Sequence, residues 1–256
     1  MRVLVVIANP NPKSFCHAVL GEFTAGLKEG GHSTEVVDLY AERFDPVLRV
    51  RDFNSYVHES MPMDVLSSMN LKQRALETAG GPLRRFLLAR VLGNKDPRAL
   101  AKLAWDHRPK DVRAHQEKVA RAEGLAFVAP VFWLGFPAIL KGWFERVFTY
   151  GMAYALTPEG WAGNISGRVG LLRHEKALVI STTLFSEADY KAGLEEPLRK
   201  VVDDFGLRYP GVKRVEHVYF YRVGAVADDV RRGYLKRAFE LGRTFAEPPA
   251  AAVAAA

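Results

Sequence analysis

The sequence predicts a doubly wound α/β fold: a five-stranded parallel sheet with helices on both faces, plus a helical insertion. Five short apolar runs of strand length are spread along the 256 residues. Helical patterns separate these runs, and strands that alternate with helices are typical of parallel sheets covered on both faces. One long stretch, from about 60 to 110, breaks this rhythm. The expected strands are residues 2–8, 33–39, 124–131, 176–183 and 215–223.

The first three elements are a strand, a helix and a strand. RVLVVIA (2–8) has the pattern of a buried strand. The helical pattern over 17–31 places its apolar residues on one face, and Gly30 and Gly31 close it, as glycine often does at helix ends. STEVVDL (33–39) then supplies the second strand.

The stretch from about 60 to 110 is too long for a plain connection. GGPLRRFLLARVLG and KDPRALAKLAW within it predict two short amphipathic helices, each with a proline at its start. We interpret the stretch as an inserted helical lid. The basic segment RRFLLAR could instead touch a membrane surface or a partner protein.

The second half of the chain supplies three strands and their helices. Within 137–148 the apolar residues form one stripe, and Pro137 stands where a first-turn proline is tolerated. We therefore expect one domain over 1–246 with the insertion at about 60–110, and a disordered tail at 247–256. The expected helices are residues 111–123, 137–148, 195–205 and 227–245.

Composition narrows the class of protein. Hydrophobic content of 48% and charged content of 25% are ordinary for a soluble globular protein, and no apolar run approaches the roughly 20 residues of a membrane span, so we expect a cytoplasmic protein. The single cysteine, Cys16, excludes an internal disulfide and a multi-cysteine zinc site, and we expect no metal. The net charge of +7 permits acidic partners, but no zinc finger or RNA-binding signature occurs, so nucleic-acid binding ranks last.

Three loops follow the carboxyl ends of strands, where ligands bind in this architecture. The loop 8–17 has no GxGxxG, but Ser14 and the amides that open the next helix can hold a phosphate; plain helix capping by Ser14 is the alternative. The loop 130–135 offers Trp133 as a flat wall for a planar ring system. In the loop 181–190, backbone amides can face an electron-accepting ring, or the hydroxyl residues can serve ordinary turn chemistry.

The longest motif, FPAILKGWFERVF (136–148), resembles the flavodoxin-like family of NAD(P)H quinone reductases. This is the DT-diaphorase group, which also includes modulator-of-drug-activity proteins and the ancillary reductases of bacterial potassium efflux systems. PVFWLG, SFCHAV and DLYAERFDPVL extend the resemblance over most of the chain apart from the insertion and the tail. The resemblance implies a flavodoxin-like fold.

The family resemblance also implies a bound flavin, which is FAD by family preference with FMN possible, and NAD(P)H as co-substrate. Asn9 and Cys16 stand where many relatives have His and Asn, and Leu184 and Phe185 replace two glycines, which changes the shape of the expected pocket. The resemblance places the following residues at the flavin: Asn9, Ser14, Phe15, Cys16, Pro130, Val131, Phe132, Trp133, Leu134, Thr182, Thr183, Leu184, Phe185 and Arg231.

Two tyrosines are the catalytic candidates that the resemblance implies. Tyr190 falls at the family spacing for a tyrosine that stabilises the reduced flavin, and Tyr154 resembles a residue that reaches the neighbouring subunit's pocket in a homodimer. Glu196 occupies the spacing of a histidine found in some relatives, so no histidine-assisted relay is expected. Core packing for Tyr154 and a plain surface charge for Arg231 remain open alternatives.

The expected function is flavin-dependent reduction of quinones or related small aromatic acceptors by NAD(P)H, through ping-pong hydride transfer. The alternative is a flavin-binding regulatory or accessory subunit of a partner such as a transporter, with the insertion around Leu83–Leu92 as the docking surface. The acceptor and the choice between NADH and NADPH stay open at this point.

Overall fold

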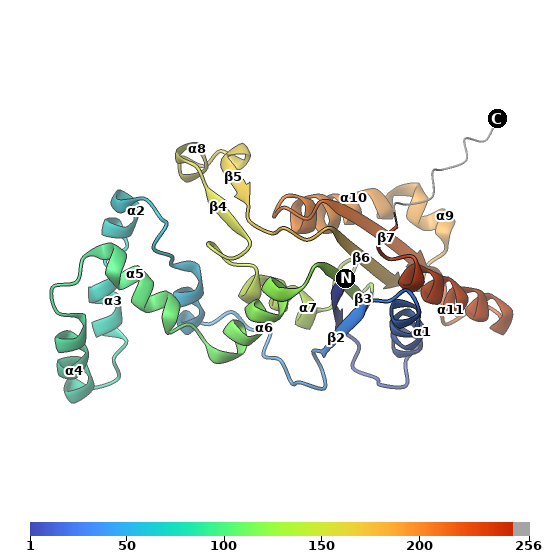
Figure 1. Ribbon diagram of the computed structural model, residues 1–256, viewed down its shortest axis with the longest axis horizontal. Helices are drawn as coiled ribbons and strands as arrows, with labels where there is room; N and C mark the ends of the chain where they lie inside the picture. The colour runs from blue at the N-terminus through green and yellow to red at the C-terminus, as the bar shows by residue number, and fades with distance from the viewer. Residues whose placement is uncertain (248–256) are drawn as a thin grey trace. The chain divides into compact units, whose positions relative to one another are not determined.

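The computed structural model describes residues 1–247, and its centre is a parallel five-stranded sheet in the order β2-β1-β3-β6-β7 (Figure 1). Every neighbouring pair of strands in this sheet is parallel, which confirms the predicted fold class. Apart from Glu247, the tail predicted at 247–256 lies outside the described residues. The strands are β1 (Arg2–Ile7), β2 (Ser33–Asp38), β3 (Gly124–Pro130), β6 (Lys176–Thr182) and β7 (Arg214–Phe220).

The chain forms two compact units. Among the described residues, the first comprises 1–46, 118–141 and 172–247, and the second comprises 47–117 and 142–171. Helices of the first unit are α1 (Phe15–Glu29), α9 (Glu187–Asp189), α10 (Glu195–Arg199) and α11 (Asp228–Arg243), whereas α6 (Lys110–Arg121) and α7 (Ala138–Val147) each have residues in both units. The second unit contains the 3-10 helix η1 (Val50–Tyr56), α2 (Met63–Ser68), α3 (Leu71–Glu77), α4 (Pro82–Leu92), α5 (Pro97–Asp106), β4 (Tyr154–Leu156), α8 (Pro158–Trp161), the 3-10 turn η2 (Ile165–Gly167) and β5 (Arg168–Gly170).

Several elements differ from those expected, and among them α2 and α3 stand in the insertion beside the two helices predicted there. A small antiparallel pair, β4 and β5, was not expected, because strands of three residues carry no readable period. The helix expected at 195–205 is part of a longer helical run, in which π-helical stretches η3 (Tyr190–Leu194) and η4 (Lys200–Arg208) flank α10. Gly193 kinks this run with a φ of +154°, a conformation that glycine adopts without a side-chain clash.

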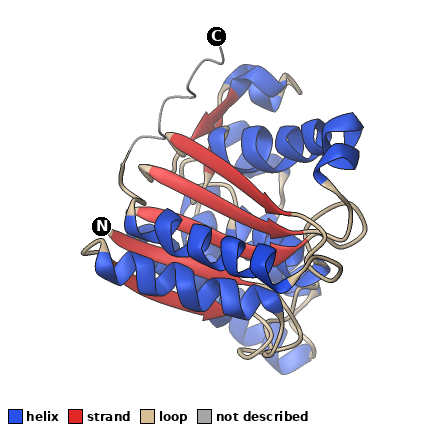
Figure 2. Cartoon of the chain, turned by 90° about the vertical axis from the view of Figure 1, so that its right-hand side faces the viewer, coloured by secondary structure: helices blue, strands red, loops and turns tan. Residues whose placement is uncertain are grey.

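One face of the sheet is covered by α1 and α11, which Figure 2 shows lying across the strands. Alternate residues of the central strands, such as Val5, Val128 and Ile180, form one core with both helices. Since β3 and β6 are buried along their whole lengths, their sequences are mostly apolar instead of alternating.

Glycines allow α1 and α11 to approach each other at backbone distance. A Cβ on Gly26 would stand 2.0 Å from the carbonyl oxygen of Phe239, and one on Gly242 would stand 2.2 Å from that of Phe23. Neither neighbour is a flexible side-chain end, so the contact requires glycine at both positions.

We expect Gly26→Ala to destabilise the protein by about 1–3 kcal/mol, the usual penalty of overpacking, because the two helices must separate. Gly21 lies in the same helix with nothing within 4 Å of its missing Cβ. Gly21→Ala should therefore stabilise the chain by up to about 1 kcal/mol through helix propensity. Urea unfolding of both variants tests these two predictions. Equal changes in the free energy of unfolding would contradict the close approach of the two helices at Gly26.

The second unit contains an ion triad of one arginine and two aspartates. Arg146 is fully buried and donates to Asp52 Oδ1 at 2.9 Å and to Asp111 Oδ2 at 2.7 Å. Burial alone would lower the pKa of Arg146, but its hydrogen bonds with the two carboxylates raise it above its usual value. The triad ties α7 to η1 and to α6.

Candidate functional site

The carboxyl edge of the sheet is where its topology reverses. The chain leaves β1 toward β2 on one side, and β3 pairs with β1 on the other. In open α/β sheets this switch point is where ligands bind, since the two connections leave in opposite directions. The three loops of interest end β1, β3 and β6, which are neighbours in the sheet.

Thr182 joins all three loops. Its hydroxyl lies 3.2 Å from the Sγ of Cys16 in the first loop, and its carbonyl oxygen accepts the N–H of Val131 in the second at 2.9 Å. Thr182 itself ends β6, before the third loop. The structure therefore brings the predicted loops together at one edge.

The second loop is a tight two-residue turn. Phe132 and Gly135 exchange both backbone hydrogen bonds, at 3.0 and 3.1 Å, and the residues between them, Trp133 and Leu134, have φ of +47° and +59°. This is the pattern of a type I′ turn, which normally has Asn or Gly at both positions. A bulky residue at positive φ is strained, and such strain often marks functional sites.

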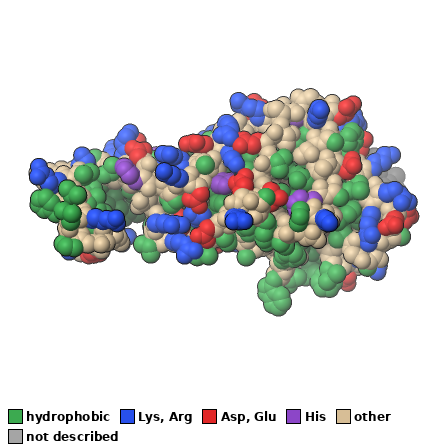
Figure 3. All heavy atoms as spheres, turned by 90° about the horizontal axis from the view of Figure 1, so that it is seen from below, with side chains coloured by type: hydrophobic (Ala, Val, Ile, Leu, Met, Phe, Trp, Pro, Cys, Tyr) green, Lys and Arg blue, Asp and Glu red, His purple; other side chains and the backbone are tan. Residues whose placement is uncertain are grey.

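The strained turn displays apolar surface. Trp133 is 100% exposed, and Phe132 and Leu134 are also exposed. On the third loop Leu184 and Phe185 are exposed as well. Hydrophobic side chains project from the surface of the face drawn in Figure 3. Two adjacent loops thus present aromatic and aliphatic side chains at the edge where a ligand is expected.

The first loop opens α1 without a side-chain cap. Ser14 makes no capping hydrogen bond, so the capping alternative is wrong; its hydroxyl instead lies 3.1 Å from Nδ1 of His17. Nε2 of His17 lies 3.2 Å from Asp38 Oδ2. The N–H groups in the first turn of α1 can hold an anion, and the hydroxyl of Ser14 and the imidazole of His17 lie beside them. His17 was missed by the sequence analysis, because only the fold places Asp38 beside it.

Cys16 is buried beneath this loop and belongs to the core under α1. Burial raises the pKa of the Cys16 thiol, and its contacts with Thr182 and Asn9 lower it by less. The thiol is therefore protonated and inert at neutral pH.

The third loop is closed by its own residues. The hydroxyl of Thr183 donates to the carbonyl oxygen of Phe185 at 2.9 Å. Ser186 and Asp189 form a capping box that starts α9. The turn is therefore ordered around the exposed side chains of Leu184 and Phe185.

Tyr190 lies under this loop and is only 2% exposed. Its ring centroid is 5.2 Å from that of Tyr219 and 5.5 Å from that of Tyr221. Burial raises the pKa of Tyr190, and its hydrogen bond with Thr183 lowers that pKa by less. Burial likewise raises the pKa of Tyr221 to about 12.

A buried histidine stands beside this aromatic cluster. His217 Nε2 lies 2.8 Å from Ser181 Oγ, and His217 Nδ1 lies 2.8 Å from Asp203 Oδ1. Because a carboxylate only accepts, Nδ1 carries the proton and the hydroxyl of Ser181 donates to Nε2. The imidazole stacks on Tyr219 with centroids 4.2 Å apart.

The hydrogen bonds among these Ser, His and Asp side chains resemble those of a hydrolytic triad, but their surroundings do not. Ser181, His217 and Asp203 are all buried. A substrate would therefore not reach the hydroxyl, and the network serves to hold the end of β6 against β7 and η4. Sequence reasoning missed it, because His217 reads as one position of a strand.

The buried imidazole gives stability a pH dependence. Burial lowers the pKa of His217, although Asp203 opposes the change. Below about 6.5, its value in the unfolded chain, the unfolded state binds more protons than the folded one. The stabilisation is thus present above that pH and is lost as pH falls toward the folded pKa. Over this interval the free energy of unfolding falls by roughly 1.4 kcal/mol for each pH unit by which the pH is lowered.

We expect the urea midpoint of the native chain to fall between pH 7.5 and 5.5, and His217→Gln to reduce that fall. His174, whose pKa burial also lowers, remains in the variant as a second titrating group. Equal pH dependence in both proteins would contradict a neutral His217.

The remaining predicted residues lie in different places. Asn9 follows β1, and its Oδ1 accepts the N–H of Asn11 at 3.0 Å. Arg231, in the first turn of α11, donates to the carbonyl oxygen of Val223 at 3.1 Å and pairs with Asp228 at 3.1 Å.

Tyr154 belongs to the second unit, so its part in a site of the first unit stays a prediction. There the guanidinium carbon of Arg168 lies 4.4 Å from its ring centroid. Burial raises the pKa of Tyr154.

Residues 1–247 contain no group of three or more His, Cys, Asp or Glu side chains arranged to hold a metal ion. Within the same residues, no helix is long and apolar enough to cross a bilayer.

One family model and several known proteins match this chain. A family model described as flavodoxin-like fold matches residues 1–241. NAD(P)H dehydrogenase (quinone) 1 of Cavia porcellus is 28% identical over 236 residues, which cover 90% of this chain and 72% of that protein. The ribosyldihydronicotinamide dehydrogenase-like protein traD of Penicillium crustosum is 27% identical over 93% of this chain and 79% of its own. The solved NAD(P)H:quinone oxidoreductase from Methanothermobacter marburgensis is 30% identical, with a TM-score of 0.68 over 97% of this chain and 98% of that one.

Proposed function

The chain belongs to the flavodoxin-like fold family, and from that membership we propose that it is a flavin-dependent NAD(P)H oxidoreductase that reduces quinones or related aromatic acceptors. Similarity over nearly the whole of both chains to an NAD(P)H:quinone oxidoreductase supports the reaction class.

The turn at Trp133 is the feature that carries the proposal. An indole that is 100% exposed, on a strained turn at the switch point of the sheet, is costly unless a ligand covers it. A planar aromatic ring system is the ligand that a flat apolar side chain at this edge suits best.

The residues present fit a flavin, which would supply reversible two-electron transfer when bound. The first-turn N–H groups of α1 would hold its phosphate, with Ser14 and His17 beside them. The indole of Trp133 would cover the ring, and the turn at Leu184 and Phe185 would border its polar end.

The overall reaction balances without a catalytic acid or base from the chain. NAD(P)H gives up a hydride, which is two electrons and one proton, and water supplies the second proton, so the quinone leaves as the hydroquinone. The residues at the edge orient the reactants. Tyr190 is buried behind Thr183, so we assign it a role through the loop that it supports.

The family resemblance supports several finer assignments. We propose ping-pong kinetics with one shared site, FAD with FMN as the alternative, a homodimer to which Tyr154 contributes, and a cytoplasmic location. Two of the relatives are named for different dihydronicotinamides, so the reductant is proposed only as NAD(P)H.

The test is to purify the full chain, record its absorbance and identify the released chromophore by mass. We expect a yellow protein that oxidises NADH or NADPH when menadione is added. A colourless protein that gains no bound FAD or FMN would rule out the proposal. Bound flavin without turnover on any quinone would favour the accessory-subunit alternative.

A further inference from the structure

Stripes of side chains from three helices of the second unit surround the same space. Within each stripe the residues are three or four positions apart, which places them on one face of their helix. Phe53 of η1 lies against this space as well. The stripes are Leu71 and Ala75 of α3, Leu88 and Leu92 of α4, and Leu100 and Leu103 of α5.

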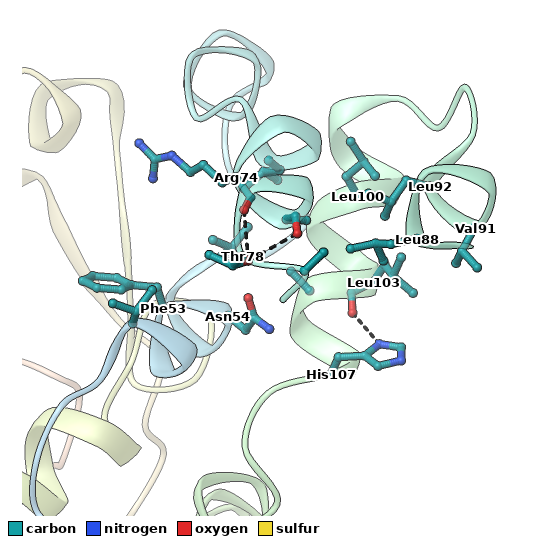
Figure 4. Close-up of a pocket in the computed structure, with 16 residues that line it drawn as sticks. Phe53, Asn54, Arg74, Thr78, Leu88, Val91, Leu92, Leu100, Leu103 and His107 are labelled. Atoms are coloured by element: carbon teal, nitrogen blue, oxygen red, sulfur yellow. Dashed lines mark hydrogen bonds between the residues drawn. The ribbon is translucent and has the colours of Figure 1, made fainter. Parts of the chain in front are cut away.

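The side chains of these stripes point toward one another but leave the space between the three helices unfilled. They line a cavity of about 450 Å³ that is partly open to solvent, because Val50, Phe53 and Val91 of its wall are exposed (Figure 4). That is about three times the roughly 150 Å³ of an apolar cavity known to bind benzene. Small residues create the space, since Ala75, Ala79 and Ala104 stand at wall positions that a packed core would give to larger side chains.

The walls of the cavity are mainly apolar, and Figure 4 shows Arg74 extending away from it. Two of its polar side chains already bond to backbone carbonyls: the hydroxyl of Thr78 donates to Arg74 at 3.0 Å, and Nδ1 of His107 lies 2.8 Å from the carbonyl oxygen of Leu103. The half-buried amide of Asn54 reaches the cavity from η1. No Asp, Glu or Lys lines the cavity, so a buried cation would find no carboxylate partner there.

We propose that this cavity is a second binding site, for a neutral and mainly apolar molecule that carries a carbonyl or hydroxyl group. Its size lies within the range of small-molecule pockets, and the amide of Asn54 can donate to a carbonyl and accept from a hydroxyl. The ordinary alternative is a loosely packed insertion core without a ligand. The site lies wholly within 50–107, so the inference does not depend on the flavin chemistry proposed above.

The test uses prodan, a neutral naphthalene ketone whose emission moves to shorter wavelength in apolar surroundings. Titrated into the full chain saturated with FAD, it should give a saturable blue shift with one site per chain. Ala75→Leu fills the cavity and should weaken prodan binding at least tenfold. Asn54→Leu should weaken it several-fold, because the ketone loses its hydrogen bond.

Ala99→Leu is the matched control, since Ala99 lies exposed on α5 and is not among the residues that line the cavity. It should leave prodan binding unchanged. Ala104→Leu repeats the filling from a second helix, in case Ala75→Leu fails to fold. Because the added side chain would occupy empty space, we also expect the melting temperature of Ala75→Leu or Ala104→Leu to be no lower than that of the native chain.

The proposal is overturned if prodan shows no saturable shift, if the filling variants bind it as well as the native chain, or if both melt at much lower temperature. Displacement of prodan by FAD would also overturn it, because the probe would then occupy the flavin site. A colourless chain that binds prodan as described would leave this inference intact while ruling out the proposed function.

Discussion

Replacing Trp133 by glycine is expected to make the protein more stable while weakening flavin binding about 30- to 100-fold. A left-handed conformation disfavours a residue with a Cβ by roughly 1–2 kcal/mol, and glycine removes that strain. Glycine also loses about 0.5–1 kcal/mol more through chain entropy, so the net gain is about 0.5–1 kcal/mol.

The loss of affinity follows from the area of the indole. A large aromatic side chain buries roughly 150–250 Å² when fully covered, so covering about half of it contributes roughly 2–3 kcal/mol at ~25 cal/mol per Å². At about 1.4 kcal/mol for each factor of ten, this is the expected 30- to 100-fold change in Kd. Titration of the apoprotein by flavin fluorescence measures it, and urea unfolding without flavin measures the stability.

Leu134→Gly is the matched control for this experiment. It relieves the same kind of strain at the other central position of the turn, where φ is +59°, and it keeps the indole. It should gain stability with a much smaller loss of affinity. If Trp133→Gly binds flavin as tightly as the native chain, the indole does not cover the ring, and the main support for the proposed function is lost.

Arg146→Met is expected to destabilise the chain by about 3–5 kcal/mol. The substitution leaves the fully buried carboxylate of Asp52 without its cationic partner, and an uncompensated buried charge has this effect. Since typical stabilities are about 5–15 kcal/mol, the second unit should unfold early. Three of the four tryptophans, Trp105, Trp143 and Trp161, lie in that unit, so urea unfolding followed by tryptophan fluorescence reports on it.

Two further variants separate the buried charge from simple loss of packing. Asp111 contacts the same guanidinium but is 43% exposed at its side chain, so Asp111→Asn should have a smaller effect, of about 1 kcal/mol. The double variant Asp52→Leu with Arg146→Met removes both deeply buried charges and should recover much of the lost stability. A double variant no more stable than Arg146→Met alone would contradict the electrostatic explanation.

The strands and long helices were predictable from their own residues. The first four strands of the sheet lie within one residue of their expected bounds, because buried parallel strands are mostly apolar and stand out between helical patterns. The strand expected at 215–223 ends earlier, at Phe220. The helices α4 and α5 of the insertion were also predicted, each from a proline at its start. The family resemblance drawn from residues 136–148 is confirmed by a family match over 1–241.

The contacts within the site were not predictable in the same way. Trp133 was expected as a flat wall, but its positive φ follows from hydrogen bonds between Phe132 and Gly135 that close the turn. Tyr190 was expected at the ring, and the structure places it among tyrosines of β7 and the loop that follows, under Thr183.

Residue order along the chain was enough to predict the fold class and the three loops, because both depend on local runs of apolar residues, prolines and glycines. The family came instead from the resemblance of one long motif, residues 136–148. The partners of the histidines became evident only in the folded chain, since Asp38 lies beside His17 and Asp203 beside His217 once β2, η4 and β7 are assembled. The cavity inside the insertion likewise exists only in the folded chain. Both features depend on side chains from distant segments meeting in space, and no local pattern of residues encodes such a meeting.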